Sequence, residues 1–298
     1  MVIVVLLGRF DDESNSALMG DAKELDSTPP RPSDAEIVAW EDQIKETEVR
    51  TKPVVGAREP LSSLAGEYAF SSSVHAKVAS LSAEYADFRR IRGDGNCFYR
   101  AVFYGLAEQV AHATDGVASR AVRDRLQNVR KELLSFGYDD LVVEGPIESL
   151  VDLFEMIGEA VPSVAIERLN ECMQDVYFSN HAIFLMRMIT SAEIKRRSDF
   201  FEPFVMGLAE MDVETFCRRC VDPMEEEADQ VQIIALTETL QVPLRVVYLS
   251  PSPFAEAGGA GGSDVDAHPF QPDRHLEGVS TVHLLYRPGH YDLLYPCA

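Results

Sequence analysis

Apolar residues recur at helical intervals through most of the chain. Within 34–49 they form one stripe along an otherwise polar segment, and Ser33 and Glu36 at its start have the spacing of a capping box. A second amphipathic stretch covers 74–85, and the pattern of 97–241 is mostly helical. The sequence therefore predicts a predominantly helical body.

Three helices of this body have recognisable ends or periodicity. One is expected at 118–136, where Gly137 stops it, and another at 146–160, where Pro146 opens it. A third is expected at 226–241, whose apolar residues again repeat with the period of a helix.

The end of the chain changes to the pattern of β-strands. Short runs rich in Val, Leu and Tyr occupy 243–249, 281–287 and 290–296. The first two are separated by a loop of about 30 residues with a glycine-rich stretch at 258–262, and a loop this long is expected to be disordered or functional. A helical body followed by a C-terminal sheet predicts an α+β domain.

A chain of 298 residues, of which 46% are apolar, can bury the core of one large domain. Residues 1–33 are expected to form a disordered tail, because 8–33 are polar and rich in proline. The remaining 34–298 would form the domain, with a helical arm at about 34–58. The apolar run Val2–Leu7 is too short to cross a bilayer, and no other stretch is long enough, so no membrane association is expected.

Acidic residues outnumber basic ones by 49 to 27, which gives a formal net charge of −22. Such a surface repels a phosphate backbone, so nucleic-acid binding is not expected. The charge favours a partner with a basic face or tail, although it also simply promotes solubility. The five cysteines are sparse and odd in number, which indicates a reducing cytosolic setting. The protein is expected to be a monomer in the cytoplasm and also in the nucleus.

The densest local signal is the run RGDGNCFYR at 92–100. Two glycines flank Asp94, Asn96 offers a helix cap, and an apolar helix follows, so Cys97 is expected in the first turn of that helix. The macrodipole and free N–H groups there favour a thiolate, and uncovered backbone N–H groups suit an oxyanion hole. A buried structural cysteine behind a tight turn would give the same local pattern.

A second signal is the run PGHYD at 288–292, which opens the last predicted strand. His290 and Asp292 are two positions apart and therefore point to the same face of that strand. The carboxylate can accept a hydrogen bond from one ring nitrogen and leave the other facing a thiol. A lone His-x-Asp pair is more often a surface feature, but with Cys97 it is consistent with a thiol–imidazole–carboxylate triad, which assembles in space.

Other chemically interesting residues carry weaker signals. Cys217 and Cys220 form a Cys-x-x-Cys pair in a segment with a helical pattern, but no second pair follows at zinc spacing, so no metal and no cofactor are expected. His283 is expected to pack or to lie at the surface near the site. No ligand spacing is shown by His112, His181, His268 and His275. Core positions are expected at Phe184, Met186 and Met188 and in the run 199–204.

The stretches DGNCFYRA at 94–101 and LLYRPGHYDLLY at 284–295 resemble the signature blocks of the otubains, a branch of the ovarian-tumour-domain deubiquitinases. The similarity covers about 34–298, nearly the whole chain outside the tail. It continues in four further segments: 60–69, 84–92, 189–204 and 213–236.

This resemblance implies a papain-like fold and the thiol-dependent hydrolysis of isopeptide bonds at the C-terminal glycine of ubiquitin, without a metal. It implies that Cys97 is the nucleophile and His290 the general base and acid. It also implies that Asp292 orients His290, and that Asp94 lies in the oxyanion-hole loop and acts through its backbone N–H. The implied partners are ubiquitin and polyubiquitin chains, with ubiquitin-conjugating enzymes as further partners.

Two alternatives remain from the sequence. In the first, the protein binds ubiquitin or conjugating enzymes and blocks the synthesis of ubiquitin chains without catalysing cleavage. The intact cysteine, histidine and aspartate argue against such an inactive form. A general papain-like peptidase is the other, but the glycine-serine-cysteine-tryptophan block expected around such a nucleophile is missing. Two departures from the otubain pattern are Gly93, where a proline is common, and the long loop at 250–280.

Overall fold

The computed structural model describes residues 47, 49–68, 71–249 and 266–297. The predicted tail and most of the predicted helical arm lie outside these residues. No helix in the described part of the chain is long and apolar enough to cross a membrane. The strands are β1 Val55–Pro60, β2 Tyr85–Ile91, β3 Leu244–Tyr248, β4 Ala267–Phe270, β5 Val282–Arg287 and β6 His290–Pro296. The helices are η2 Leu61–Tyr68, α2 Ser72–Leu81, α3 Cys97–His112, α4 Val117–Ser135, α5 Asp140–Glu159, α6 Pro162–Gln174, α7 Val176–Arg196, α8 Ser198–Ala209, α9 Val213–Phe216, η3 Cys217–Val221 and α10 Gln230–Leu240.

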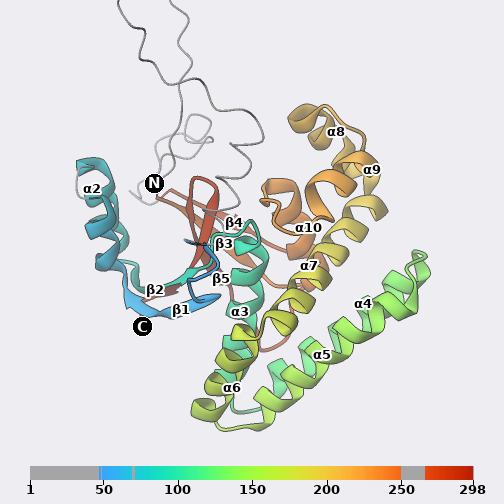
Figure 1. Cartoon of the computed structure of the whole chain (residues 1–298), viewed down its shortest axis with the longest axis horizontal. Helices are drawn as coiled ribbons and strands as arrows, with labels where there is room; N and C mark the ends of the chain where they lie inside the picture. The colour runs from blue at the N-terminus through green and yellow to red at the C-terminus, as the bar shows by residue number, and fades with distance from the viewer. Residues whose placement is uncertain (1–46, 48, 69–70, 250–265, 298) are drawn as a thin grey trace, which may run out of the picture. The chain divides into compact units, whose positions relative to one another are not determined.

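The strands form one mixed sheet in the order β1-β2-β6-β5-β3-β4, parallel only between β3 and β5 (Figure 1). The α+β class is therefore confirmed, and so are the three strands predicted near the end of the chain. The expectation that the whole sheet is C-terminal was wrong, because β1 and β2 precede Cys97 and β2 pairs with β6. Residues 55–58, expected in a helical arm, belong to β1.

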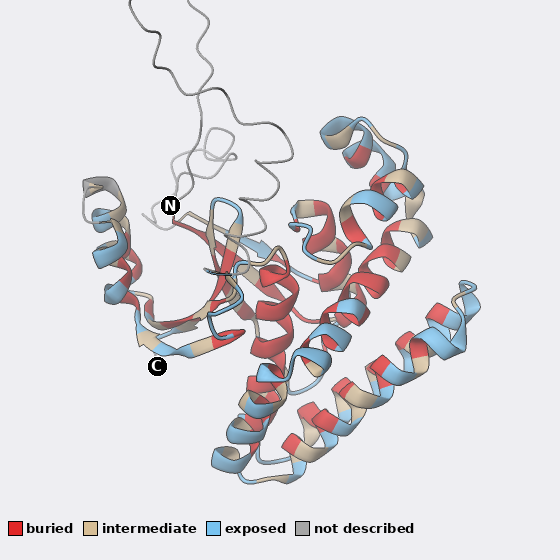
Figure 2. Ribbon diagram, viewed as in Figure 1, coloured by how far each residue is buried: buried red, intermediate tan, exposed pale blue. Residues whose placement is uncertain are grey.

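Adjacent residues of the strands face opposite sides of the sheet, and each side has its own core. Leu293 belongs to the larger core, which contains α3 and the helices α4 to α7, whereas Leu294 belongs to a smaller core under η2 and α2. Helix α3 lies against β5 and β6 and is buried along nearly its whole length (Figure 2). A helix covered on all sides holds its N-terminal end in a fixed place, and that end is Cys97.

Local capping explains where several helices begin. Helix α5 starts at Asp140, six residues before the predicted start, because the Asp139 carboxylate accepts from the Leu141 N–H at 3.0 Å. Pro146 therefore lies inside the helix, where its ring is buried. Helix α10 starts at Gln230 rather than 226, because Asp229 and Gln232 form a capping box there.

Three further predictions are corrected by the structure. The connection after β3 contains one short strand, β4, which pairs with β3, whereas 271–281 form only turns and bends. In the run 199–204, Phe201 is buried, but Phe200 and Phe204 are 42% and 48% exposed on α8. Met186 and Met188 are core residues as predicted, whereas Phe184 is 36% exposed. Helical period alone does not reveal which side of α8 lacks a neighbour.

The helical layer should depend on aromatic packing between α3 and α5. Phe154 is 1% exposed and meets Phe103 edge-to-face, with 5.9 Å between ring centroids. We expect Phe154→Ala to lower the free energy of unfolding by about 3–5 kcal/mol, because it removes buried area and leaves a cavity. Urea denaturation measures this. Phe204→Ala is the matched control and should cost less than about 1 kcal/mol, and an equal loss in both variants would contradict the assigned packing.

Candidate active site

Cys97 is the first residue of α3, as predicted, and only 3% of it is exposed. The loop that delivers it runs from the end of β2 through Gly93, Asp94 and Gly95. Helix N-termini leave their first N–H groups without intrahelical acceptors, so the thiol lies in a field that favours negative charge. The position therefore suits a nucleophilic thiolate.

The carboxylate of Asp94 fixes this loop. Its two oxygens accept from the two terminal nitrogens of Arg100 at 2.8 and 2.9 Å, and one oxygen also accepts from the Asn96 N–H at 3.0 Å. Arg100 is almost fully buried, so the bidentate pair is shielded from solvent. The loop position predicted for Asp94 is thus observed, and its side chain has a structural role that the sequence did not indicate.

Asn96 does not cap the helix with its side chain, contrary to the prediction. Its Oδ1 instead accepts from Arg187 at 2.7 Å and from the Glu225 N–H at 3.0 Å. Gly95 has φ +75°, and a Cβ there would lie 1.8 Å from the Glu225 carbonyl oxygen. A glycine is therefore required at this position, where the catalytic loop touches the segment between η3 and α10.

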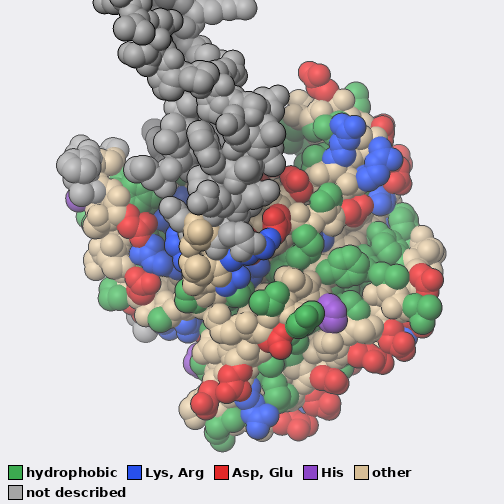
Figure 3. Space-filling view, viewed as in Figure 1, with side chains coloured by type: hydrophobic (Ala, Val, Ile, Leu, Met, Phe, Trp, Pro, Cys, Tyr) green, Lys and Arg blue, Asp and Glu red, His purple; other side chains and the backbone are tan. Residues whose placement is uncertain are grey.

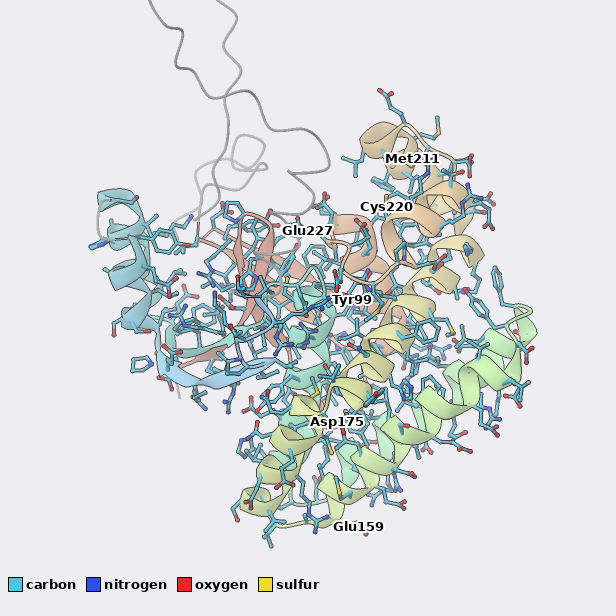
Figure 4. All side chains as sticks on the ribbon, viewed as in Figure 1. Tyr99, Glu159, Asp175, Met211, Cys220 and Glu227 are labelled. Atoms are coloured by element: carbon cyan, nitrogen blue, oxygen red, sulfur yellow. The ribbon has the colours of Figure 1, made fainter. Side chains whose placement is uncertain are left out.

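Arg187 is the main residue that sequence reasoning missed. It is 1% exposed on α7, donates to the carbonyls of Gly95, Val221 and Glu226, and stacks over Tyr99 at 4.5 Å from the ring centroid. Figure 4 labels Tyr99 where α3 and α7 face each other. One buried guanidinium thus holds the catalytic loop and the neighbouring segment together. The only signal in the sequence is a lone arginine within an otherwise apolar stretch of a helix.

His290 opens β6 directly after the turn at Gly289, whose φ is +70°. Its Nε2 lies 2.8 Å from Asp292 Oδ1, so Nδ1 is the ring nitrogen left for another partner. A Cβ at Gly93 would come within 3.2 Å of Nδ1, so the absence of a side chain there leaves room for the ring. The thiol of Cys97 lies near enough to the His290 ring to raise the pKa of that ring.

The electrostatics favour a protonated His290. Burial lowers its pKa, but the hydrogen bonds to Asp292 and Cys97 and the charges of both outweigh burial and raise the pKa to about 9. Imidazolium therefore persists through neutral pH and loses its proton only above about pH 9. The structure thus brings Cys97, His290 and Asp292 together, and their catalytic roles stay a prediction.

Asp292 is fully buried, and both of its carboxylate oxygens accept hydrogen bonds. Oδ1 accepts from the Ile91 N–H at 2.9 Å as well as from His290, and Oδ2 pairs with Arg287. Burial raises the pKa of this carboxyl, but the hydrogen bond and charge of His290, the Arg287 guanidinium and the Ile91 amide together lower it. Asp292 is therefore an ionised acceptor held in one orientation.

Several backbone donors of the loop are available for a developing oxyanion. The Asn96 N–H already donates to Asp94, whereas the N–H groups of Asp94, Gly95 and Cys97 have no acceptor within the described part of the chain. The Asp94 N–H, which the resemblance implies for this role, is thus available together with the N–H of the nucleophile itself. This geometry suits the stabilisation of negative charge on an oxygen bound next to the thiol.

A groove of about 700 Å³ passes beside Gly289, the neighbour of His290 in the sequence. Its apolar side is formed by Leu208, Phe216, Tyr286 and Tyr291, and its acidic side by Glu225, Glu226, Glu227 and Asp229. Glu227 is labelled in Figure 4 on the segment before α10. Burial and the neighbouring Glu226 raise the pKa of Glu227, against the attraction of His290. The groove thus suits an extended ligand with basic and apolar side chains.

The weaker candidates are explained by packing. Cys217 is buried in η3, and burial raises the pKa of its thiol to about 11. In the described residues, no three His, Cys, Asp or Glu side chains are grouped so as to hold a metal ion. His283 Nδ1 lies 3.0 Å from the Tyr85 hydroxyl, and burial, with Arg245 nearby, lowers the His283 pKa to about 4.

Comparisons with known proteins agree with this geometry. The family model described as Peptidase C65 Otubain matches residues 47–296. The chain is 37% identical over 269 residues to the ovarian tumor domain-containing deubiquitinating enzyme 1 of Arabidopsis thaliana, covering 86% of each chain. It is 33% identical to the human ubiquitin thioesterase OTUB1, covering 88% of this chain and 90% of the human one. A solved h/ceOTUB1 complex with ubiquitin aldehyde and UBC13~Ub superposes with a TM-score of 0.74, at 27% identity over 89% of this chain and 99% of the solved one.

The pKa of His290 should lie above the ordinary range of histidine, and that of His283, at the other end of β5, should lie below it. NMR of the ring resonances should show His290 half-protonated near pH 9 and His283 near pH 4. In Asp292→Asn the midpoint of His290 should fall by at least about one pH unit, because the counter-charge is lost while the ring stays buried. The midpoint of His283 should stay in place as an internal reference. A His290 midpoint that does not move would show that Asp292 does not stabilise the imidazolium.

Proposed function

The chain belongs to the otubain family of C65 peptidases, and we propose that it is a cysteine-type deubiquitinase that hydrolyses isopeptide bonds at the C-terminal glycine of ubiquitin. One observation carries the proposal. The Cys97 thiol, at the start of a buried helix, lies near enough to His290 to raise the pKa of its ring, and the Nε2 atom of that ring is held by the buried Asp292 carboxylate. This is the arrangement that a thiol needs for acyl transfer.

Cys97 attacks the carbonyl carbon of the terminal glycine of ubiquitin and forms a tetrahedral intermediate. The Cys97 N–H donates to the oxyanion, and the loop locked by Asp94 and Arg100 holds this amide in place. His290, protonated at neutral pH, delivers its proton to the departing lysine amine. The C–N bond breaks and a thioester to Cys97 remains.

The second half of the reaction releases ubiquitin. His290, now neutral, takes a proton from water as the water attacks the thioester. The thiolate leaves, and the imidazolium–thiolate pair is restored. Asp292 keeps the same ring nitrogen engaged through both halves, so the other nitrogen of His290 faces the reacting groups each time.

The groove beside Gly289 is the proposed path for the C-terminal tail of ubiquitin. This tail is basic and ends in glycine, and the groove offers four carboxylates and an apolar wall. Glycines at its end can pass where bulky side chains cannot. Elsewhere, acidic side chains line the face formed by α4 to α6 (Figure 3), so the negative charge of the protein is not confined to the groove. Local geometry, rather than charge alone, selects the tail.

A second function is binding of a ubiquitin-conjugating enzyme. The solved complexes that superpose on the chain contain UBC13~Ub or UBCH5B~Ub together with ubiquitin aldehyde. A protein that holds a charged conjugating enzyme can block chain synthesis without cleaving anything. The two functions use different chemistry, so a variant without the thiol separates them.

We also propose that the protein acts in the cytoplasm and nucleus as a monomer. All five cysteines are free thiols, as a reducing compartment allows. Fractionation of cells and size-exclusion chromatography with light scattering test the location and the assembly.

Cys97→Ala should reduce the cleavage of di-ubiquitin by at least about 10³-fold, because no other nucleophile lies in the site. Binding of mono-ubiquitin, measured by calorimetry, should change by less than about threefold. Inhibition of a charged conjugating enzyme should also persist. Di-ubiquitin cleavage at a near wild-type rate in this variant would disprove the assignment of the nucleophile.

Charge reversal in the groove should weaken substrate binding more than chemistry. We expect Glu226→Lys to raise KM for a ubiquitin–fluorophore substrate by about tenfold at low ionic strength, with a smaller effect in high salt because screening weakens the interaction. Glu148→Lys, which changes an exposed carboxylate of α5 outside the groove, is the matched control. Equal effects of the two variants would mean that net charge, and not the groove, attracts the substrate.

A further inference from the structure

A series of charged contacts connects the Asp292 carboxylate with the helix η2, which precedes the catalytic loop in the sequence. Arg287 pairs through one terminal nitrogen with Asp292 Oδ2 and donates through the other to Glu67 Oε2 at 3.0 Å. The side chain of Arg287 is 15% exposed and that of Asp292 is fully buried, so this end of the series of contacts is shielded from solvent. Glu67 lies in η2, on the face of the sheet opposite α3.

Glu67 itself is held between two guanidinium groups. Its other oxygen pairs with Arg90 of β2, and Arg90 in turn reaches Glu59 of β1 at 3.2 Å. Tyr68, next to Glu67, also lies near Arg287 and raises the pKa of its guanidinium. Residues of η2 therefore contact Arg287 on the side opposite Asp292, and these contacts restrict the rotation of its guanidinium group.

The geometry of the β5–β6 hairpin explains how the position of Arg287 affects the orientation of Asp292. Arg287 is the cross-strand partner of His290, and the turn between them contains only two residues. Asp292 must present Oδ1 to the imidazole, and it does so because Arg287 occupies Oδ2 while the Ile91 N–H occupies the other position on Oδ1. If Arg287 turned away, the buried carboxylate would lose its only cationic side-chain contact besides His290 in the described structure. Its orientation would then be poorly determined.

We propose that Glu67 is a positioning residue of the reaction, which acts through Arg287 to fix the orientation of Asp292 and thereby of His290. The proposal deepens the proposed function and rests on the same triad. It makes η2, which contacts no reacting atom, a part of the machinery that sets kcat. It also assigns Arg287 a role at the carboxylate, whereas its place in the sequence shows only that it precedes the turn.

The chain offers a closely matched control for Glu67. Glu59 is also a carboxylate paired with Arg90, and their side chains are 35% and 37% exposed, but Glu59 makes no contact with Arg287. A glutamine at either position removes one charge and keeps the shape. A general effect on surface charge or on the β1–β2 edge would therefore appear in both variants.

The test is a double-mutant cycle in kcat on a ubiquitin–fluorophore substrate. Glu67→Gln should lower kcat by about threefold to tenfold with KM unchanged within about twofold, and Glu59→Gln should leave both within about twofold. In an Asp292→Asn background, Glu67→Gln should cause less than about twofold further loss, because its effect passes through Asp292. Melting temperatures establish that each variant is folded at the assay temperature.

Equal losses from Glu67→Gln in the two backgrounds would overturn the proposal, as would equal losses from Glu67→Gln and Glu59→Gln, or no loss at all. A second readout does not depend on ubiquitin. It is the rate at which iodoacetamide alkylates Cys97, measured by mass spectrometry of the Cys97 peptide in the wild type, the two single variants and the double variant of the cycle. If the wild-type protein fails to cleave ubiquitin, the proposed function fails. The alkylation cycle still decides whether Glu67 acts through Asp292, and additive effects in it would overturn the positioning role.

Discussion

The constraint on which the site depends is the burial of one ionised carboxylate. Asp292 has no access to water, so every hydrogen bond that it would have made to solvent must come from the protein. The Ile91 N–H, His290 and Arg287 supply these bonds from β2, β6 and β5. Because the three donors come from three neighbouring strands, the sheet cannot shift its register without leaving a buried charge unpaired. The catalytic geometry and the register of the paired strands therefore depend on each other.

The catalytic loop that carries Cys97 depends in the same way on a buried ion, but here the ion is a cation. Arg187 is a buried cation whose hydrogen bonds end on backbone carbonyls and on Asn96, and these acceptors lie in two separate segments, the catalytic loop and 221–226. A buried guanidinium that lost contact with either segment would leave donors without partners, which costs more free energy than the hydrogen bonds contribute when made. The thiol and the imidazole thus lie between two buried ions, each of which is satisfied only by the folded arrangement.

Local sequence was sufficient for the parts of the site that are local. The helix that begins at Cys97 and the strand that begins at His290 are encoded by turn glycines and apolar periodicity within a few residues. The pairing of β2 with β6 was not predicted, because the two strands are about 200 residues apart and the pattern of one says nothing about the other. Arg187 and Arg287 were missed for the same reason. An arginine in an apolar segment has no visible partner until the fold supplies one.

The position of β6 in the sheet has a consequence for folding during synthesis on the ribosome. β6 lies between β2 and β5 and carries His290, yet it is synthesised after every other strand of the described residues. Until residues 290–296 have left the ribosome, β2 and β5 each expose an unpaired edge and no imidazole is present beside Cys97. The nascent chain carries a thiol but no acid–base partner for it. The enzyme becomes able to react with the ubiquitin around it only in the same step that closes its sheet.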